Sequence, residues 1–164
     1  PAAAGIAGAA DGSARGAAGR SMTALSGTVA DFIGAARVGR LGTVDAGGQP
    51  LVVPICYAFD GSALFSAIDG KPKKAGGRGL KRIRNIEGNP RVCVAIDHYD
   101  EDWSRLRYVI IQGEAEIIES GPDYGRAVAM LVAKYPQYRT LPIDPGTGLM
   151  IKVTPRSVLS WSLS

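Results

Sequence analysis

Residues 39–68 read GRLGTVDAGGQPLVVPICYAFDGSALFSAI, and this stretch decides the fold class. The run 39–44 is followed by a Gly-rich turn, and the apolar, β-branched run 50–59 ends at an Asp-Gly pair. Asp-Gly between two strand-like runs is a signal for a tight hairpin turn. The run 63–68 then returns as a strand, so the stretch predicts a three-stranded antiparallel meander.

Strand-like segments recur later in the chain, at 91–99, 107–118, 149–153 and 157–163. Gly113 interrupts one of them, which indicates a bulge or a bend. Consecutive strands with short connections favour antiparallel pairing, and six or seven such strands favour a closed or partly closed barrel. The last two segments are expected to pair with each other.

Two or three helices are expected to be inserted among these strands. Apolar residues at helical spacing predict one helix that ends near Val38 and can be capped by Thr23 or Ser26. A second helix lies around 80–90 and stops at a Gly-Asn-Pro sequence, and a third opens near Pro122.

The chain of 164 residues is long enough for one domain with a core. Residues 1–21 are Ala/Gly-rich, and we expect a flexible arm or a cloning remnant there, followed by a single domain at 22–164. No apolar run approaches the ~20 residues that span a bilayer, and no basic segment precedes an apolar core as in a secretory signal. The expected location is the cytoplasm, without membrane contact.

Cys56 and Cys93 each lie inside an apolar, strand-like run, so we expect reduced and buried thiols. A disulfide between them stays open as an alternative. One histidine and two separated cysteines do not suit a zinc site. The acidic stretch 97–102 lacks the spacing of a calcium-binding EF-hand loop. We therefore predict no metal site.

The segment 71–84 concentrates positive charge and indicates an anionic partner. Its cations, with no acid among them, are Lys71, Lys73, Lys74, Arg78, Lys81, Arg82 and Arg84. The segment lacks interleaved aromatic residues and the net charge is only +4, so binding to nucleic acid is not favoured. A solvated loop and helix face is the plainer alternative.

The order of these elements resembles the split β-barrel flavin and deazaflavin oxidoreductases, the relatives of pyridoxamine 5′-phosphate oxidase, over about residues 38–163. Within them, KPKK (71–74), NPR (89–91) and DHYDEDW (97–103) resemble an actinobacterial branch of F420-dependent enzymes. The resemblance implies a mainly β fold with inserted helices, a six- to seven-stranded antiparallel split β-barrel like that of FMN-binding proteins. It also implies a homodimer with a cofactor groove between the two barrels, and hydride transfer between reduced F420 and a small unsaturated organic molecule.

The resemblance also assigns roles to residues. Lys71 and Lys73 would hold the cofactor phosphate, and Lys74, Arg78 and Arg82 would extend along the anionic tail of F420. Residues expected near the cofactor ring or its surroundings, with ordinary barrel packing as the alternative, are Arg40, Thr43, Pro54, Ser66, Ala67 and Ile68.

The catalytic residues stay open, because in these proteins the cofactor carries the chemistry. Tyr57, His98 and Tyr99 are candidates for a proton donor. Trp103 is expected to cover the pocket or to pack at the dimer interface, and the acids around it to be solvated.

Two other functions suit the same fold. One is binding of flavin mononucleotide, or of haem in a degradation or storage role. The other is sequestration of F420 without catalysis.

Overall fold

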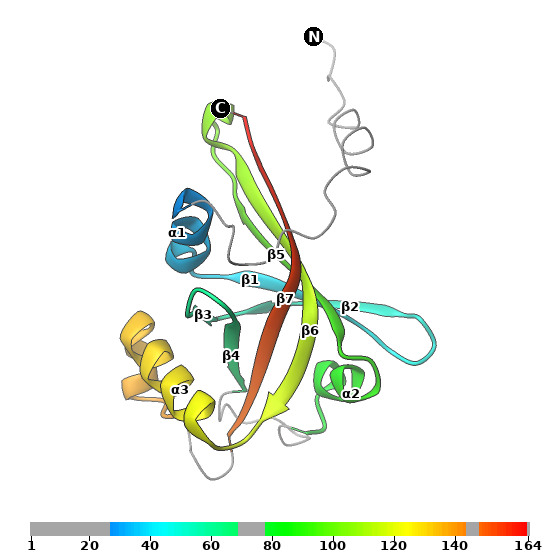
Figure 1. The fold of residues 1–164 in the computed structure, drawn as a ribbon. Coiled ribbons are helices and arrows are strands. Elements are labelled where there is room, and N and C mark those ends of the chain that lie inside the picture. Colours follow the sequence, from blue (N-terminus) through cyan, green and yellow to red (C-terminus); the bar gives the residue numbers. More distant parts are fainter. Residues whose placement is uncertain (1–26, 69–77, 144–147, 164) are drawn as a thin grey trace.

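The computed structural model describes residues 27–68, 78–143 and 148–163. Its main element is an antiparallel sheet of seven strands in the order β2-β1-β5-β6-β7-β4-β3, which curls around a core (Figure 1). The strands are β1 (Gly39–Val44), β2 (Pro50–Ile55), β3 (Ala58–Phe59), β4 (Leu64–Ile68), β5 (Arg91–His98), β6 (Arg107–Ile118) and β7 (Leu149–Ser162). The predicted fold class, a mainly β split barrel with inserted helices, is confirmed.

The turns of the opening stretch form as predicted. Asp45 Oδ1 accepts hydrogen bonds from the backbone N–H groups of Gly47 and Gln49 and closes the β1–β2 hairpin. Asp60 Oδ1 does the same for Ser62 and Ala63 in the β3–β4 hairpin. Short acidic side chains stabilise tight turns in this way because they replace a missing backbone acceptor.

The meander itself is a wrong prediction, because the run 50–59 is not one strand. The chain leaves the sheet at Cys56 and Tyr57; β2 pairs only with β1, and β3 pairs only with β4. Tyr57 turns into the core and is fully buried. The two halves of the run therefore lie at opposite edges of the strand order, and the short link between them closes the curl of the sheet.

The expected pair of strands at the end of the chain is also wrong, since β7 is one continuous strand of 14 residues. It pairs with β6 along its length, with a register shift at Gly113, which confirms the predicted irregularity there. Gln112 lies opposite Ser157 and Gly113 opposite Pro155, so the extra residue is Arg156. Pro155 has no N–H to donate, which explains why the regular ladder breaks at this point.

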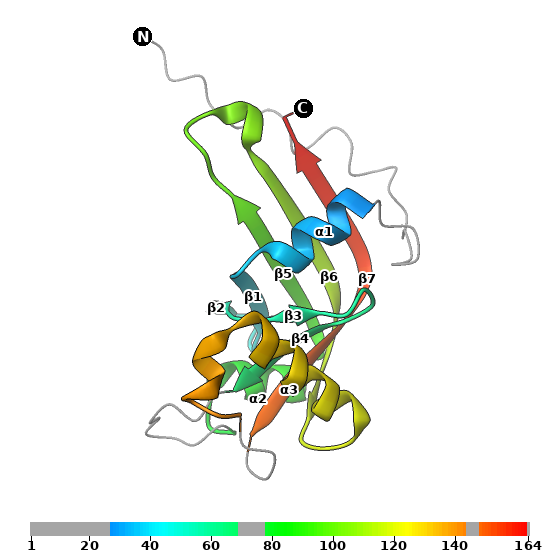
Figure 2. The ribbon, with the colours of Figure 1, turned by 90° about the vertical axis from the view of Figure 1, so that its left-hand side faces the viewer.

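In the part of the chain that the structure describes, three α-helices accompany the sheet: α1 (Gly27–Ala35), α2 (Lys81–Gly88) and α3 (Pro122–Lys134). The capping residues predicted for the first helix lie outside the described residues, and that helix ends three residues before Val38. Two short 3-10 helices, η3 (Trp103–Arg105) and η4 (Pro136–Arg139), complete the fold. Figures 1 and 2 show α2 against one end of the sheet and α1 beside the far ends of β5, β6 and β7.

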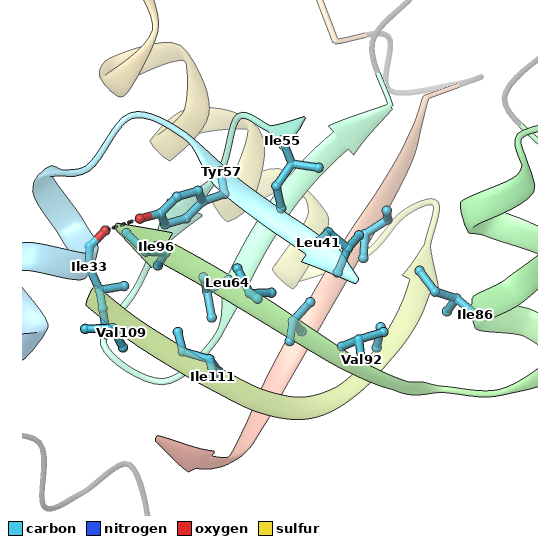
Figure 3. Packing of buried hydrophobic residues seen from close by; sticks show 14 of the residues in the cluster. Ile33, Leu41, Ile55, Tyr57, Leu64, Ile86, Val92, Ile96, Val109 and Ile111 are labelled. Atoms are coloured by element: carbon cyan, nitrogen blue, oxygen red, sulfur yellow. Dashed lines mark hydrogen bonds between the residues drawn. The ribbon is translucent and has the colours of Figure 1, made fainter. Parts of the chain in front are cut away.

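The core fills the inside of the curled sheet (Figure 3). Alternate residues of each strand point inward, so Val92, Val94 and Ile96 of β5 are all buried. From α2, Ile83 and Ile86 enter the same cluster and close one end of it. A second cluster lies between α3 and the outer side of β3 and β4.

The carbonyl groups at the end of α1 are bonded by side chains from distant elements. The Tyr57 hydroxyl donates to Ile33 O at 2.6 Å (Figure 3), and Lys134 Nζ donates to Ala36 O at 2.7 Å. The Tyr135 hydroxyl lies 2.7 Å from the next carbonyl oxygen, that of Arg37. A helix C-terminus has carbonyls without partners and favours a cation, so these contacts join α1 to α3.

Because Lys134 is partly buried, the stability of the protein should depend on pH. Burial, and to a lesser degree the charge of Arg37, lower the pKa of Lys134 from 10.5 to about 8. Between these values the unfolded chain binds the extra proton, so the free energy of unfolding should rise with pH from about 8 upward. Below pH 8 both states are protonated, and this contribution stays constant.

Urea unfolding between about pH 7 and 9.5 measures this slope, at pH values where Tyr57, whose pKa burial raises, stays protonated. Lys134→Met should flatten the rise relative to the unchanged chain. If the free energy of unfolding changed equally with pH in the two proteins, the role given to Lys134 would be contradicted.

The two cysteines are free, and their predicted burial holds only in part. Cys93 is half-buried in β5, whereas Cys56 is exposed. The reason is the break after β2, where Tyr57 turns inward and its neighbour faces outward. Among the described residues, no helix has both the length and the apolar character needed to cross a bilayer.

Candidate functional site

The basic segment is described only in its second half. Lys71, Lys73 and Lys74 lie outside the described residues. Arg78 forms ion pairs with Glu87 and Glu119, and Lys81 Nζ lies 3.0 Å from Asp45 Oδ2. The chain's own acids therefore neutralise part of the charge that the segment carries. Arg82 is half-buried on α2.

The residues predicted near a cofactor ring divide between the two faces of the sheet. Thr43, Ser66 and Ile68 are buried. The Thr43 hydroxyl accepts a hydrogen bond from Asn85 Nδ2 at 3.0 Å, which joins β1 to α2. Ala67 is half-buried. Thr43 thus has a structural partner of its own inside the fold.

Arg40 and Pro54 lie instead on the outer face of the sheet, which we define by the side chains of β1, β2, β5, β6 and β7 that point away from the core. Arg40 lies opposite Pro54 on one side and Ala95 on the other, and it forms an ion pair with Asp97. The apolar side chains of Ile110 in β6 and Leu159 in β7 continue this row across the sheet. Arg40 is therefore at the edge of an apolar strip.

A groove of about 540 Å³ lies on this outer face beside Gly42, Cys93 and Gln112. Arg91 and Arg156 line it as well, and Arg156 pairs with Glu114 at 2.6 Å. The sequence interpretation missed both arginines. The position of Arg156 depends on the register shift opposite Gly113, which sequence spacing does not reveal.

The acidic stretch 97–102 shapes the end of a projecting arm, which we define as residues 96–98, 106–110 and 159–162 with η3 between β5 and β6 (Figure 1). Asp102 accepts a hydrogen bond from Ser104 N and caps η3, and the Ser104 hydroxyl contributes most to lowering the pKa of the Asp102 carboxyl. Asp100 likewise accepts a hydrogen bond from Asp102 N, so these two acids stabilise the turn. No group of three His, Cys, Asp or Glu that could hold a metal ion occurs in the described part of the chain.

The candidate proton donors differ in their surroundings. Tyr57 is fully buried and its hydroxyl already donates to Ile33 O, so it is not accessible to a ligand at the surface. Tyr99 is 65% exposed, and its hydroxyl lies 3.4 Å from a Glu101 oxygen. His98 Nε2 lies 3.6 Å from Asp100 Oδ2, at the end of β5.

Trp103 is half exposed in η3, at the tip of the arm. Figure 1 shows that this tip and α2 lie at opposite ends of the molecule. A single chain therefore does not bring Trp103 to Arg78 or Arg82.

A second hollow, which we name the arm cavity, encloses about 570 Å³ between α1 and the arm. His98 lines it together with Phe32, Arg107 and Val109. Of these four residues, only His98 belonged to the predicted site. Arg107 and Phe32 are more than 70 positions apart in the sequence, and no local pattern links them.

The fold has counterparts among known proteins. A family model described as pyridoxamine 5′-phosphate oxidase matches residues 25–162. The chain belongs to the pyridoxamine 5′-phosphate oxidase family. The resemblance inferred from sequence is thereby confirmed, and the chain is placed in a family of flavin- and deazaflavin-type oxidoreductases.

Within and around this family, three similar proteins are informative. A reductase of 5a,11a-dehydrotetracycline and 5a,11a-dehydrooxytetracycline from Streptomyces rimosus is 29% identical over 133 residues, 80% of this chain and 79% of the relative. A structure described as an F420 reductase is 26% identical, with a TM-score of 0.56 over 79% of this chain and 94% of the other. The conserved hypothetical protein Rv2991 from Mycobacterium tuberculosis is 24% identical, with a TM-score of 0.65 over 90% and 91% of the two chains.

Proposed function

We propose that this member of the pyridoxamine 5′-phosphate oxidase family is an F420-dependent oxidoreductase that acts on a small unsaturated organic molecule in the cytoplasm. The observation that carries the proposal is the acid-free run of cations at 71–84, which leads into the N-terminus of α2. Leu80 holds the N-cap position there without a capping side chain. Uncapped N–H groups at a helix start favour phosphate and other anions.

The two reductases among the similar proteins support the same proposal, since one is described by F420 and the other by reduction of an unsaturated polycyclic substrate. The chemistry that F420 supplies when bound is hydride transfer to an organic acceptor. This chain would bind and orient the cofactor. Lys71, Lys73 and Lys74 would hold its phosphate and the start of its acidic tail, because charge-assisted bonds from lysine grip such groups strongly.

The cations of this segment that the structure describes have smaller roles in the proposed binding of F420. Arg78 and Lys81 have acidic partners within the chain, so we assign them a supporting role at most. Arg82, half-buried on α2, would contribute to the positive field rather than contact the cofactor freely. Arg40 and Pro54, on the outer face, would line the cofactor groove from the side of β1 and β2.

The first test is a titration of the purified protein with F420 and, separately, with flavin mononucleotide, followed by cofactor fluorescence. We expect F420 to bind more tightly, and Lys73→Ala to weaken F420 binding about tenfold because one charge-assisted phosphate contact is lost. Binding should also weaken with salt.

Arg84→Ala is the matched control, since it removes an exposed cation of the same segment at its far end. Equal losses in both variants would mean that the segment acts only through its net charge. Tight binding of flavin mononucleotide without binding of F420 would refute the proposal in favour of the flavin alternative. Binding of F420 without reduction across a broad substrate screen would favour a sequestering protein, and a haem spectrum in the purified protein would favour haem storage or degradation.

We further propose that the protein is a homodimer joined through the outer face of its sheet. Val52 is 63% exposed and Leu159 48% exposed there, beside the half-buried Ile110. An apolar sheet face of this kind is stabilised by covering it, and a stable interface buries about 800 Å² on each partner. The groove beside Arg91 and Cys93 would then lie between two subunits.

Sedimentation equilibrium tests the dimer, with an expected mass of twice the 17.1 kDa chain. Leu159→Glu places a charge in the strip and should shift the protein to a monomer. Leu141→Glu, at a residue 50% exposed but remote from the strip, should leave the dimer intact. A monomeric wild-type protein at tens of micromolar would contradict the proposal, because obligate interfaces are stable at such concentrations.

A further inference from the structure

The arm cavity is an open hollow bounded by two elements that lie far apart in the sequence. Its floor is the inner face of the arm, where His98 pairs with Arg107 and Arg107 with Ser162 in register. Its wall is α1, which contributes Val29 and Phe32. Figure 2 shows α1 running beside β5 and β6. The volume of about 570 Å³ falls in the range of small-molecule pockets.

Arg107 is the distinctive polar group of this cavity. Its guanidinium carbon lies 4.3 Å from the centre of the Phe32 ring. Neighbouring Arg105 is engaged with Asp100 and Asp102, whereas no described carboxylate pairs with Arg107. A guanidinium whose face rests on an aromatic ring keeps its N–H edge for a planar anion, which it can bind through two parallel hydrogen bonds.

The remaining surroundings suit an organic ligand with a flat body. Val29, Leu106 and Val109 supply apolar surface close to the arginine. The rings of Tyr108 and Trp161, whose centres are 5.5 Å apart, stack on the opposite, outer face of the arm, in line with Ile110 and Leu159.

We propose that the arm cavity binds a flat organic anion, with its carboxylate or sulfonate on Arg107 and its ring system against Phe32 and Val29. Arg107 selects the charge of the ligand, and α1 selects its shape. If the cavity holds the substrate of the oxidoreductase proposed above, that substrate is an anionic conjugated molecule; this extension alone rests on the proposed function.

A pair of fluorescent probes tests the proposal without any cofactor. 8-Anilinonaphthalene-1-sulfonate and N-phenyl-1-naphthylamine share one ring system, and only the first carries an anion. We expect the sulfonate to bind saturably, one molecule for each chain, and more tightly than the neutral probe. Arg107→Met should weaken binding of the sulfonate about tenfold and change binding of the neutral probe less than about twofold.

Two further variants serve as controls for the effect of Arg107→Met on probe binding. Arg139→Met removes an exposed arginine of η4, outside the cavity, and should leave both affinities unchanged. Arg107→Lys retains the charge and should retain most of the sulfonate affinity, which also covers the case in which Arg107→Met fails to fold. An unchanged sulfonate affinity in Arg107→Met, equal losses for the two probes, or no saturable binding would overturn the proposal. None of these outcomes affects the F420 titration, and a failed F420 titration leaves the probe result intact.

Discussion

Gly113→Ala should destabilise the protein by about 3 kcal/mol, the upper range for overpacking a rigid site. A Cβ atom at this position would lie 2.4 Å from the carbonyl oxygen of Thr154 and 3.1 Å from Pro155 Cα. Both obstacles are backbone atoms of β7, the strand paired with β6 on both sides of the register shift. Relief would require the two long strands to separate where they form the centre of the sheet.

Chemical denaturation of the purified variants measures this effect. Gly125→Ala is the matched control, because Gly125 lies in α3 and a Cβ atom added there would meet no other atom within 4 Å. Alanine in a helix interior is favoured over glycine, so this variant should gain about 0.5–1 kcal/mol. A Gly113→Ala protein within about 0.5 kcal/mol of the unchanged chain would show that the two strands yield at little cost.

Tyr135→Phe is expected to cost about 2 kcal/mol, because it removes a buried hydroxyl that serves several backbone groups. That hydroxyl accepts a hydrogen bond from Tyr57 N at 3.1 Å and lies 2.7 Å from Arg37 O and 2.9 Å from Tyr57 O. Tyr57 N belongs to the link between β2 and β3, outside the regular ladder. Without the hydroxyl, this buried N–H loses the partner that the fold provides.

The loss should appear in urea unfolding as a lower midpoint with an unchanged slope, since the unfolded state is the same. Tyr99→Phe is the control, because that hydroxyl is on an exposed ring and has only a long contact to Glu101. It should change stability by less than about 0.5 kcal/mol. Equal effects of the two substitutions would contradict the role given to the buried hydroxyl.

Local signals predicted the elements of this fold well. The Asp-Gly turn after the run 50–59 and the proline at 122 mark elements that the structure contains. The break at Cys56 and Tyr57 was not predictable from the sequence. An apolar, β-branched run has the pattern of a single strand even when its two halves pair with different strands. In the folded protein Tyr57 bonds to Ile33 and Tyr135, which lie far from it in the sequence, and these contacts hold the chain outside the sheet at the break.

The residues of the candidate site were predicted only in part, because some of their partners are distant in the sequence. The sequence indicated the charge of the segment 71–84 but not the acids that neutralise Arg78 and Lys81, since Glu119 and Asp45 are distant in sequence. It placed His98 among the candidates but passed over Arg107, which lies opposite it in the sheet.

The sequence by itself determined the family, the strand-forming segments, the two tight turns closed by Asp45 and Asp60, and the location of the basic segment, because each depends on residues that are neighbours along the chain. The tertiary structure alone decided which strand edges meet, where Arg156 emerges at the register shift, and that Arg107 rests on Phe32. Those features arise when the sheet curls to bury its apolar face, and this curl brings together residues between which no sequence pattern exists.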